Sequence, residues 1–310
     1  MKTLHVSNAP HIHSGDTTQK IMLDVVIAML PASVAAVVIF GIQALWIILT
    51  CVASAVIAEL LFNLACGKKS TIHDCSAVVT GLLLALNLST KVPLWQCVIG
   101  SVFAIVVVKG FFGGIGKNIV NPAIAARVLM LLTFGAVGGG ANPTIQGENV
   151  LVSGATPLDG LNKGEESATL LQLLLGTHGG AIGETCAIAL LLGFIYLVAR
   201  KVIKWYVPAA FVGTTFLCYL VFTGNVTLAL SHVLAGGLLL GAIFMATDYV
   251  TTPVTNLGRV VFCVGCGLIT FYIRQFGSYP EGVSISILVM NLLVPFIERF
   301  TAKKTLGGIK

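Results

Sequence analysis

Apolar runs and short polar segments alternate along almost the whole chain. A helix needs about 20 apolar residues to cross the hydrocarbon core of a bilayer. Scanning for such runs predicts ten membrane-spanning helices, five on each side of a long polar interval at 136–180. The predicted spans are 21–40, 42–65, 74–88, 93–110 and 116–135, then 181–199, 206–223, 226–246, 255–274 and 283–298. The run at 74–88 is short and the run at 116–135 is interrupted by Gly and Asn, so we expect both to be tilted or broken.

Composition supports this pattern and excludes a water-soluble protein. The 310 residues are 56% hydrophobic and only 10% charged, whereas soluble domains are about 25% charged. The fold class expected is therefore an all-α polytopic membrane protein. Eight cysteines lie in apolar runs or at their edges and none in the long polar interval, so no disulfide framework is expected. The first twenty residues lack the apolar core and cleavage site of a signal peptide.

Lysine and arginine positions predict the orientation, because cationic residues near span ends are retained on the cytoplasmic side. With the amino terminus inside, fourteen of the eighteen cations fall on inner segments, three fall on outer segments, and Arg127 lies within a span. The inner set is Lys2, Lys20, Lys68, Lys69, Lys109, Lys117, Arg200, Lys201, Lys204, Arg259, Arg299, Lys303, Lys304 and Lys310, and the outer set is Lys91, Lys163 and Arg274. This topology, rather than a nucleic-acid partner, explains the net charge of +6.

The same bias divides the chain into segments of a multi-pass cell-membrane protein. Residues 1–20 and the basic tail 299–310 are expected in the cytoplasm, and the 136–180 loop outside the membrane. Within the halves, "SAVVTGLLLAL" at 76–86 resembles "SHVLAGGLLLGAI" at 231–243, each in the third span of its half. Five spans per half then make 21–135 and 181–298 inverted repeats, whose interface commonly holds the functional site. Chance similarity between leucine-rich helices is the alternative.

A helix start is predicted inside the bilayer by "GFFGGIGKNIVNPAIAARVL" at 110–129. Asn121 suits the N-cap and Pro122 the first helical position. Non-helical backbone at membrane depth is tolerated only where protein or a polar cavity satisfies it, so a broken element beside an internal site is expected. Arg127 follows within the membrane and needs a partner, either an acidic side chain or oxygens of a ligand.

Among the acids in or beside predicted spans, where charge is costly, are Asp24, Glu59, Glu184 and Asp248. Asp24, Glu59 and Asp248 are the candidates for a cation pathway. The alternative is that an acid of this kind lies in interfacial water, caps a helix or forms an ion pair.

No metal site and no catalytic residue are predicted. Cys263 and Cys266 place two thiols on one helical face, but zinc and iron–sulfur sites usually need four ligands, so packing is favoured. His73 and Asp74 are adjacent in sequence and make a weak metal site. "GFFGGIGKN" lacks the Ser or Thr that follows a phosphate-loop lysine.

The stretch "VSGATPLDG" at 152–160 lies in the long polar interval. Ser153, Gly154 and Ala155 are small enough for another protein's active site to reach Thr156, and Pro157 favours an extended backbone at Thr156. This is the pattern of a substrate peptide, although an ordinary turn has the same composition.

Together, "SGAT" followed by Pro-Leu, "GKNIVNPAIAARVL" and the ten predicted spans closely resemble the D subunits of Rnf ion-translocating ferredoxin:NAD oxidoreductases. These are related to the B subunits of sodium-pumping NADH:quinone reductases. The resemblance covers essentially the whole chain and implies a urea-channel-like fold of two inverted five-helix repeats. It implies FMN on Thr156 through a phosphoester, attached by a separate flavin transferase.

The resemblance also implies partner subunits and electron relay between ferredoxin and NAD, coupled to outward movement of Na⁺ or H⁺. A second, non-covalent flavin such as riboflavin is expected in the membrane part. We interpret Asn118, Asn121 and Arg127 as its candidate contacts because they are polar at membrane depth. A channel or secondary carrier for a small polar solute, with an unmodified loop, is the alternative function. A purely structural assembly subunit is a third interpretation.

Overall fold

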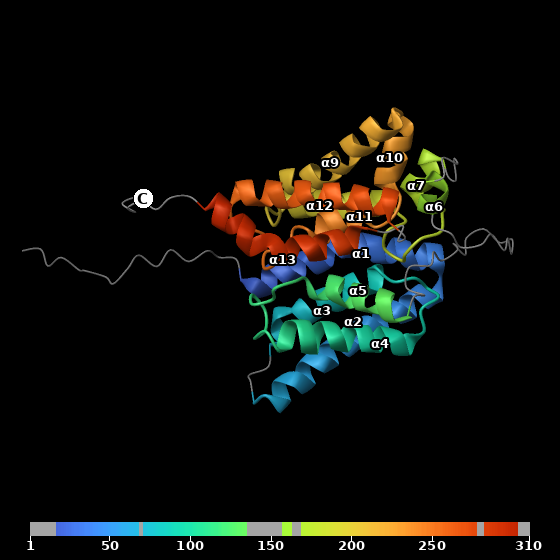
Figure 1. The fold of residues 1–310 in the computed structure, drawn as a ribbon. Helices are drawn as coiled ribbons and strands as arrows, with labels where there is room; N and C mark the ends of the chain where they lie inside the picture. Colours follow the sequence, from blue (N-terminus) through green and yellow to red (C-terminus); the bar gives the residue numbers. More distant parts are fainter. Residues whose placement is uncertain (1–16, 68–70, 135–156, 163–168, 278–281, 303–310) are drawn as a thin grey trace, which may run out of the picture.

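The computed structural model describes residues 17–67, 71–134, 157–162, 169–277 and 282–302. Every regular element in these segments is a helix (Figure 1), so the predicted all-α class is confirmed. The first half contains α1 (Thr18–Phe40), α2 (Ile42–Ala65), the 3₁₀ turn η1 (Ile72–Asp74), α3 (Ser76–Leu86), α4 (Leu94–Val102), the π-helix η2 (Phe103–Gly110) and α5 (Pro122–Phe134).

The rest of the described chain contains two short helices and the second apolar half. The short helices are α6 (Pro157–Asn162) and α7 (Leu170–Leu175), the latter starting at a capping box of Thr169 and Gln172. The second half contains α8 (Ala187–Ala199), α9 (Tyr206–Thr223), α10 (Val226–Leu234), α11 (Leu238–Leu240), the π-helix η4 (Gly241–Met245), α12 (Asn256–Phe276) and α13 (Val283–Thr301).

Helix length separates these elements into two groups. Five helices are long and apolar enough to cross a membrane: α1, α2, α9, α12 and α13. The segment α10–η4 becomes a sixth if its two parts, bent by 65°, count as one span. Four predicted spans contain shorter apolar helices, at 76–86, 94–110, 122–134 and 187–199. Each predicted span thus contains helix, but the number of ten full spans is not confirmed.

Glycines set the closest helix contacts. A Cβ on Gly193 of α8 would lie 2.3 Å from the carbonyl oxygen of Ala28 in α1, and one on Gly81 of α3 would lie 2.8 Å from Cys51 O in α2. Only glycine lets these backbones approach so closely, as is common between membrane helices. The α1–α8 contact joins the two halves of the chain.

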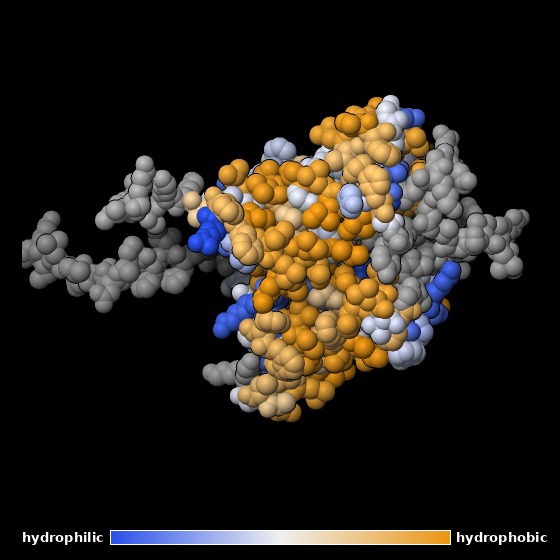
Figure 2. Space-filling view, in the orientation of Figure 1, coloured by the Kyte–Doolittle hydropathy of each residue, from blue (hydrophilic) through white to orange (hydrophobic). Residues whose placement is uncertain are grey.

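The surface suits a lipid environment. Apolar side chains form a broad belt over the helices, and hydrophilic groups gather towards its ends (Figure 2). The start of α1 and the end of α13 lie at one end of the molecule, whereas α6 and α7 lie at the other (Figure 1). The belt between these two ends is the part of the surface that would face lipid.

The two similar sequences are broken at different points. In the first half, left-handed Cys75 (φ 60°) precedes α3, so "SAVVTGLLLAL" is one continuous helix. In the second, Gly236 (φ 70°) falls inside the matching sequence and separates α10 from α11. The extra glycine therefore lies where the second copy bends. The inverted repeat and the domain ranges remain predictions.

Candidate functional site

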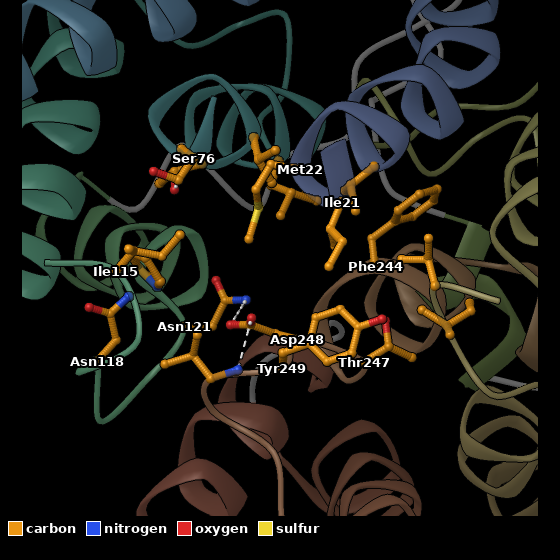
Figure 3. Close-up of a pocket in the computed structure, with 18 of the residues that line it drawn as sticks. Ile21, Met22, Ser76, Ile115, Asn118, Asn121, Phe244, Thr247, Asp248 and Tyr249 are labelled. Atoms are coloured by element: carbon orange, nitrogen blue, oxygen red, sulfur yellow. Dashed lines mark hydrogen bonds between the residues drawn. The ribbon is translucent and has the colours of Figure 1, made fainter. Parts of the chain in front are cut away.

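A pocket of about 760 Å³, including its open mouth, lies between the two halves. It is bounded by α1, α3, η2 and η4 and by two non-helical segments, 111–121 and 246–255 (Figure 3). Three of the predicted site residues, Asn118, Asn121 and Asp248, line this one cavity. Both π-helices end beside it, and π-helical turns are frequent at functional sites. Its other polar residues are Ser76, Thr80, Lys109 and Thr247, and its apolar walls include Ile21, Met22, Val25 and Phe244.

Asn121 connects the pocket to the start of α5. Its Oδ1 accepts hydrogen bonds from the backbone N–H groups of Ala123 (3.0 Å) and Ile124 (3.4 Å), which confirms its predicted capping role. Its Nδ2 donates to Asp248 Oδ2 across the pocket at 3.5 Å (Figure 3). One side chain thus fixes a helix start and joins the two halves.

Asp248 lies in the segment between η4 and α12. Its carboxylate also accepts hydrogen bonds from Val250 N (3.3 Å) and Thr251 Oγ1 (3.1 Å). Burial raises the pKa of the Asp248 carboxyl, and these two hydrogen bonds oppose the rise. No basic side chain of the described residues pairs with it.

Asn118 offers an acceptor that none of the described residues uses. Its Oδ1 is buried and accepts no hydrogen bond within the described chain, and its side chain lies at the pocket (Figure 3). A buried carbonyl oxygen without a donor costs free energy, so this atom suits a ligand N–H group.

Sequence reasoning missed Asn291, a buried residue of α13. In the amide orientation that satisfies its neighbours, its oxygen accepts from Asn121 N (3.2 Å) and its nitrogen donates to Thr251 O (3.0 Å). Asn291 therefore ties both non-helical segments to α13. A lone asparagine in the apolar run "ILVMNLLVPF" was the available signal.

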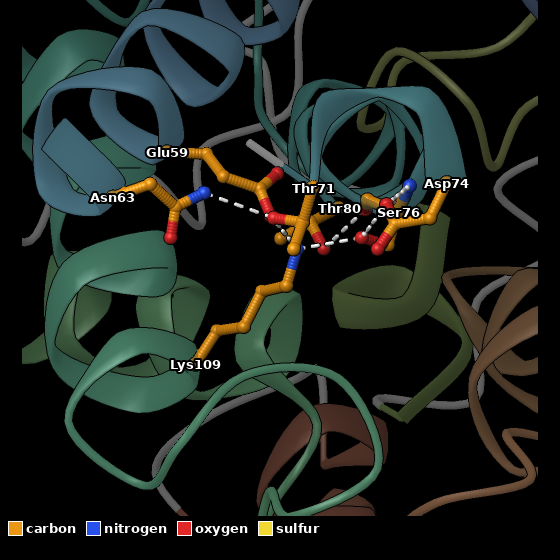
Figure 4. Close-up of polar contacts among 7 residues, drawn as sticks. All are labelled: Glu59, Asn63, Thr71, Asp74, Ser76, Thr80 and Lys109. Atoms are coloured by element: carbon orange, nitrogen blue, oxygen red, sulfur yellow. Dashed lines mark hydrogen bonds and ion pairs between the residues drawn. The ribbon is translucent and has the colours of Figure 1, made fainter. Parts of the chain in front are cut away.

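Glu59 belongs to a buried polar network next to the pocket (Figure 4). Its Oε1 accepts from Lys109 Nζ (2.7 Å) and from Thr71 Oγ1 (2.7 Å). Lys109 also donates to Ser76 Oγ, which donates to Asp74 Oδ1. Lys109 was expected among the cations at the inner membrane surface. Instead it is 4% exposed, because Glu59 and Ser76 draw its ammonium group inward.

Asp24 is also paired. Arg200 Nη2 lies 3.2 Å from its Oδ2, and Tyr196 donates a hydrogen bond of 2.9 Å to its Oδ1. Two of the three acids predicted for the cation pathway thus form ion pairs. The pairing alternative describes Asp24 and Glu59, whereas Asp248 remains without a cationic partner among the described residues.

Arg127 does not join Asn118 and Asn121 in the pocket. Its buried side chain lies outside the pocket lining. Its Nη1 donates to Asn87 Oδ1, and the carboxylate of Glu184 attracts its charge. One of the two predicted kinds of partner, an acidic side chain, is therefore present for this intramembrane cation. Its place in the fold is apart from the lining that contains the two asparagines.

Arg274 was expected at the outer surface and is instead 2% exposed. Its guanidinium group donates to His232 O (2.7 Å) and to Ala235 O (3.3 Å), at the end of α10. Both carbonyls lie at the break between α10 and α11, where the helix no longer uses them. The bend in the second half therefore explains the burial of this cation.

Other predicted features add no metal centre. Cys263 and Cys266 are buried in α12, and no group of three His, Cys, Asp or Glu within the described segments could hold a metal ion. Thr156, with Ser153, Gly154 and Ala155, lies outside the described residues.

Comparison with known proteins matches residues 5–307 to the family described as NQR2, RnfD, RnfE. This chain belongs to that family. It is 43% identical over 311 residues to the D subunit of the Na⁺-translocating ferredoxin:NAD⁺ oxidoreductase complex of Acetobacterium woodii, covering 99% of this chain and 96% of the relative. It is 38% identical over 317 residues to the D subunit of the proton-translocating complex of Clostridium ljungdahlii, covering 97% and 96%.

A third relative is the D subunit of an ion-translocating oxidoreductase complex of Stutzerimonas stutzeri. It is 36% identical over 327 residues, covering 94% of this chain and 92% of the relative. These matches confirm the resemblance to D subunits. Membership of the NQR2, RnfD, RnfE family and the apolar helices together identify a multi-pass membrane protein.

Proposed function

We propose that this chain is the membrane flavoprotein subunit of a redox-driven cation pump, which relays electrons between ferredoxin and NAD and couples them to movement of Na⁺ or H⁺. Three relatives named as D subunits of ion-translocating oxidoreductase complexes, each aligned over more than nine-tenths of both chains, support the assignment. Other subunits of such a complex are the expected partners. The expected location is the cell membrane, with both termini cytoplasmic.

One flavin, FMN, is proposed on Thr156 through a phosphoester formed by a flavin transferase. The sequence "SGATPL" supports this proposal through its small residues and following proline. With no histidine near it in sequence, the threonine serves as an anchor and not as a nucleophile in turnover. The 136–180 loop that carries it is expected on the extracytoplasmic side.

A second, non-covalent flavin is proposed in the pocket between the halves. The presence of this pocket is the observation that supports the second flavin. Ligand pockets are mostly apolar, with a few placed polar groups. The pocket matches this description with an acceptor on Asn118 that no described residue uses and apolar walls such as Met22 and Phe244. A flavin ring carries both N–H and carbonyl groups, so Asn118 would accept from it.

When bound, the flavin supplies the electron-transfer chemistry, and the protein tunes it by position, hydrogen bonds and charge. Here Asn118 and Asn121 would orient the ligand, and the apolar walls would exclude water from it. Arg127, which lies outside the pocket lining, is not included in this proposal.

Asp248 is the acid that best fits a cation pathway, because it lines the pocket and has no basic partner in the described chain. Asp24 and Glu59 would act only if their ion pairs open. Relatives named for sodium and for protons both match at similar coverage, so the transported ion is left as Na⁺ or H⁺.

Mass spectrometry of the peptide containing Thr156, from protein made with the transferase, tests the covalent flavin. We expect the mass of a flavin phosphate on wild type, none on Thr156→Ala, and full modification on the loop control Thr144→Ala. Wild type without the added mass, together with flux of a small polar solute through the purified protein, would instead support the channel alternative.

Extraction of non-covalent flavin after denaturation tests the pocket. We expect Asn118→Leu to reduce the extracted flavin strongly while the flavin on Thr156 remains. Equal amounts of extracted flavin in Asn118→Leu and wild type would remove this pocket from the proposal.

A further inference from the structure

Lys109 separates two cavities. One is the pocket described above, and the second, of about 550 Å³ including its open mouth, is lined by Glu59, Asn63 and Thr71 among others. Lys109 and Ile115 belong to both linings, and of these two only Lys109 carries a charge. Its ammonium group is therefore the charged boundary between the cavities.

The neighbours of Lys109 differ on its two sides. Ser76, which accepts a hydrogen bond from Nζ, also lines the pocket between the halves. Glu59 accepts another hydrogen bond from Nζ (Figure 4). Of the two cavities, Glu59 lines only the second. The pocket thus meets the positive charge directly, and the compensating carboxylate lies behind it.

An ammonium group has three N–H donors, and the described residues account for two of them. Both side chains of the pair are almost fully buried, 5% exposed for Lys109 and 6% for Glu59. Charges act more strongly in such a low-dielectric environment than in water. A ligand in the pocket would therefore experience the field of this pair.

We infer that Lys109 sets the reduction potential of the ligand in the pocket, and that Glu59 limits how much of its positive charge the ligand experiences. This inference rests on the proposed second flavin. Electrons added to a flavin bring negative charge that a nearby cation stabilises, so Lys109 favours the reduced form. Glu59 opposes this, because its carboxylate cancels part of the same field.

Potentiometric titration of the non-covalent flavin in the purified complex tests this inference, with electrons supplied by dithionite and removed by ferricyanide. We expect Glu59→Gln to shift its potential to more positive values and Lys109→Met to more negative values. The double variant should lie between wild type and Lys109→Met, because it loses the net positive field of the pair, and Lys109→Arg, which keeps the charge, should stay near wild type. The covalent flavin in the same sample serves as the internal reference.

Asp24→Asn is the matched control, because it removes the carboxylate of another ion pair, whose two residues line neither cavity. We expect no shift with it. A Glu59→Gln protein that keeps the wild-type potential would overturn the inference, even if Lys109→Met failed to bind flavin. Wild type without non-covalent flavin would instead overturn the proposed function on which the inference rests.

Discussion

Two ion pairs connect the helices of this protein in contrasting surroundings. Lys109 and Glu59 are 2.7 Å apart, with side chains 5% and 6% exposed. Arg200 and Asp24 are 3.2 Å apart, with side chains 44% and 11% exposed. Removing charges from water is costly unless each has a partner, whereas exposed pairs cost and contribute little. The loss of the buried pair and the loss of the exposed pair should therefore have different effects on stability.

The two ion pairs also differ in their role in the structure. Asp24 in α1 and Arg200 at the end of α8 fasten two helices that already pack through Gly193 and Ala28. Glu59 and Lys109 instead hold a charge between two cavities. A buried pair is weak evidence for stability, so its position beside cavities is the more informative feature.

The largest expected effect comes from Lys109→Met, which leaves the Glu59 carboxylate buried without its cation. We expect the free energy of unfolding to fall by about 3–5 kcal/mol. Chemical denaturation in detergent micelles, followed by circular dichroism, measures it. Lys117→Met, at an exposed position of the 111–121 segment, is the control and should show no measurable change. A loss equal to that of the control would show that Glu59 does not need this partner.

Thr71→Val removes one donor from the same carboxylate while keeping the side-chain shape. Thr71 Oγ1 lies 2.7 Å from Glu59 Oε1 and also accepts from Asn63 Nδ2 at 2.9 Å. Hydrogen bonds to charged groups contribute about 1.5–3 kcal/mol, which is the loss expected in the same denaturation measurement. Thr214→Val, whose hydroxyl donates to Ala210 O within its own helix, should cost less. Equal losses of unfolding free energy in Thr71→Val and Thr214→Val would mean that the hydrogen bond to the Glu59 carboxylate contributes no more than one within a helix.

Much of the fold follows from the sequence, because bilayer thickness demands long apolar runs and every such run contains helix. The points at which helices begin and end within these runs follow less well from the sequence. The run at 181–199 becomes helical only at Ala187, since Ile182 N and Gly183 N donate instead to Leu88 O (2.9 Å) and Leu86 O (2.8 Å). Such partners come from another part of the chain, and no local pattern specifies them.

The site was predicted in parts. Asn121 as N-cap and Asp248 as a polar residue at a span boundary both follow from local rules. The contact between Asn121 and Asp248 depends on the packing of the two halves. The burial of Lys109 was missed because counting cations assigns a side of the membrane and not a depth. Arg127 was grouped with Asn121 because both are polar at membrane depth, but α5 directs it towards Asn87.

Combining Glu59→Gln with Lys109→Met removes both charges from the buried network. Replacing a whole buried pair by neutral side chains is often close to neutral, so we expect a net loss of only about 1 kcal/mol. The double variant should therefore be more stable than Lys109→Met alone when both are denatured in parallel. Additive losses from the two single variants would mean that the residues do not interact.

The smallest effect is expected for Asp24→Asn. Arg200 is 44% exposed at the end of α8, where water screens its charge, so the change should cost at most about 1 kcal/mol. Screening also makes the cost depend on salt, because exposed charges interact less as ionic strength rises. Denaturation of wild type and Asp24→Asn at low and high salt measures this, and we expect their difference to shrink at high salt. For Lys109→Met the difference from wild type should persist, because ions do not reach its buried partner. A salt-independent cost at Asp24, as large as that at Lys109, would remove the contrast between the two pairs.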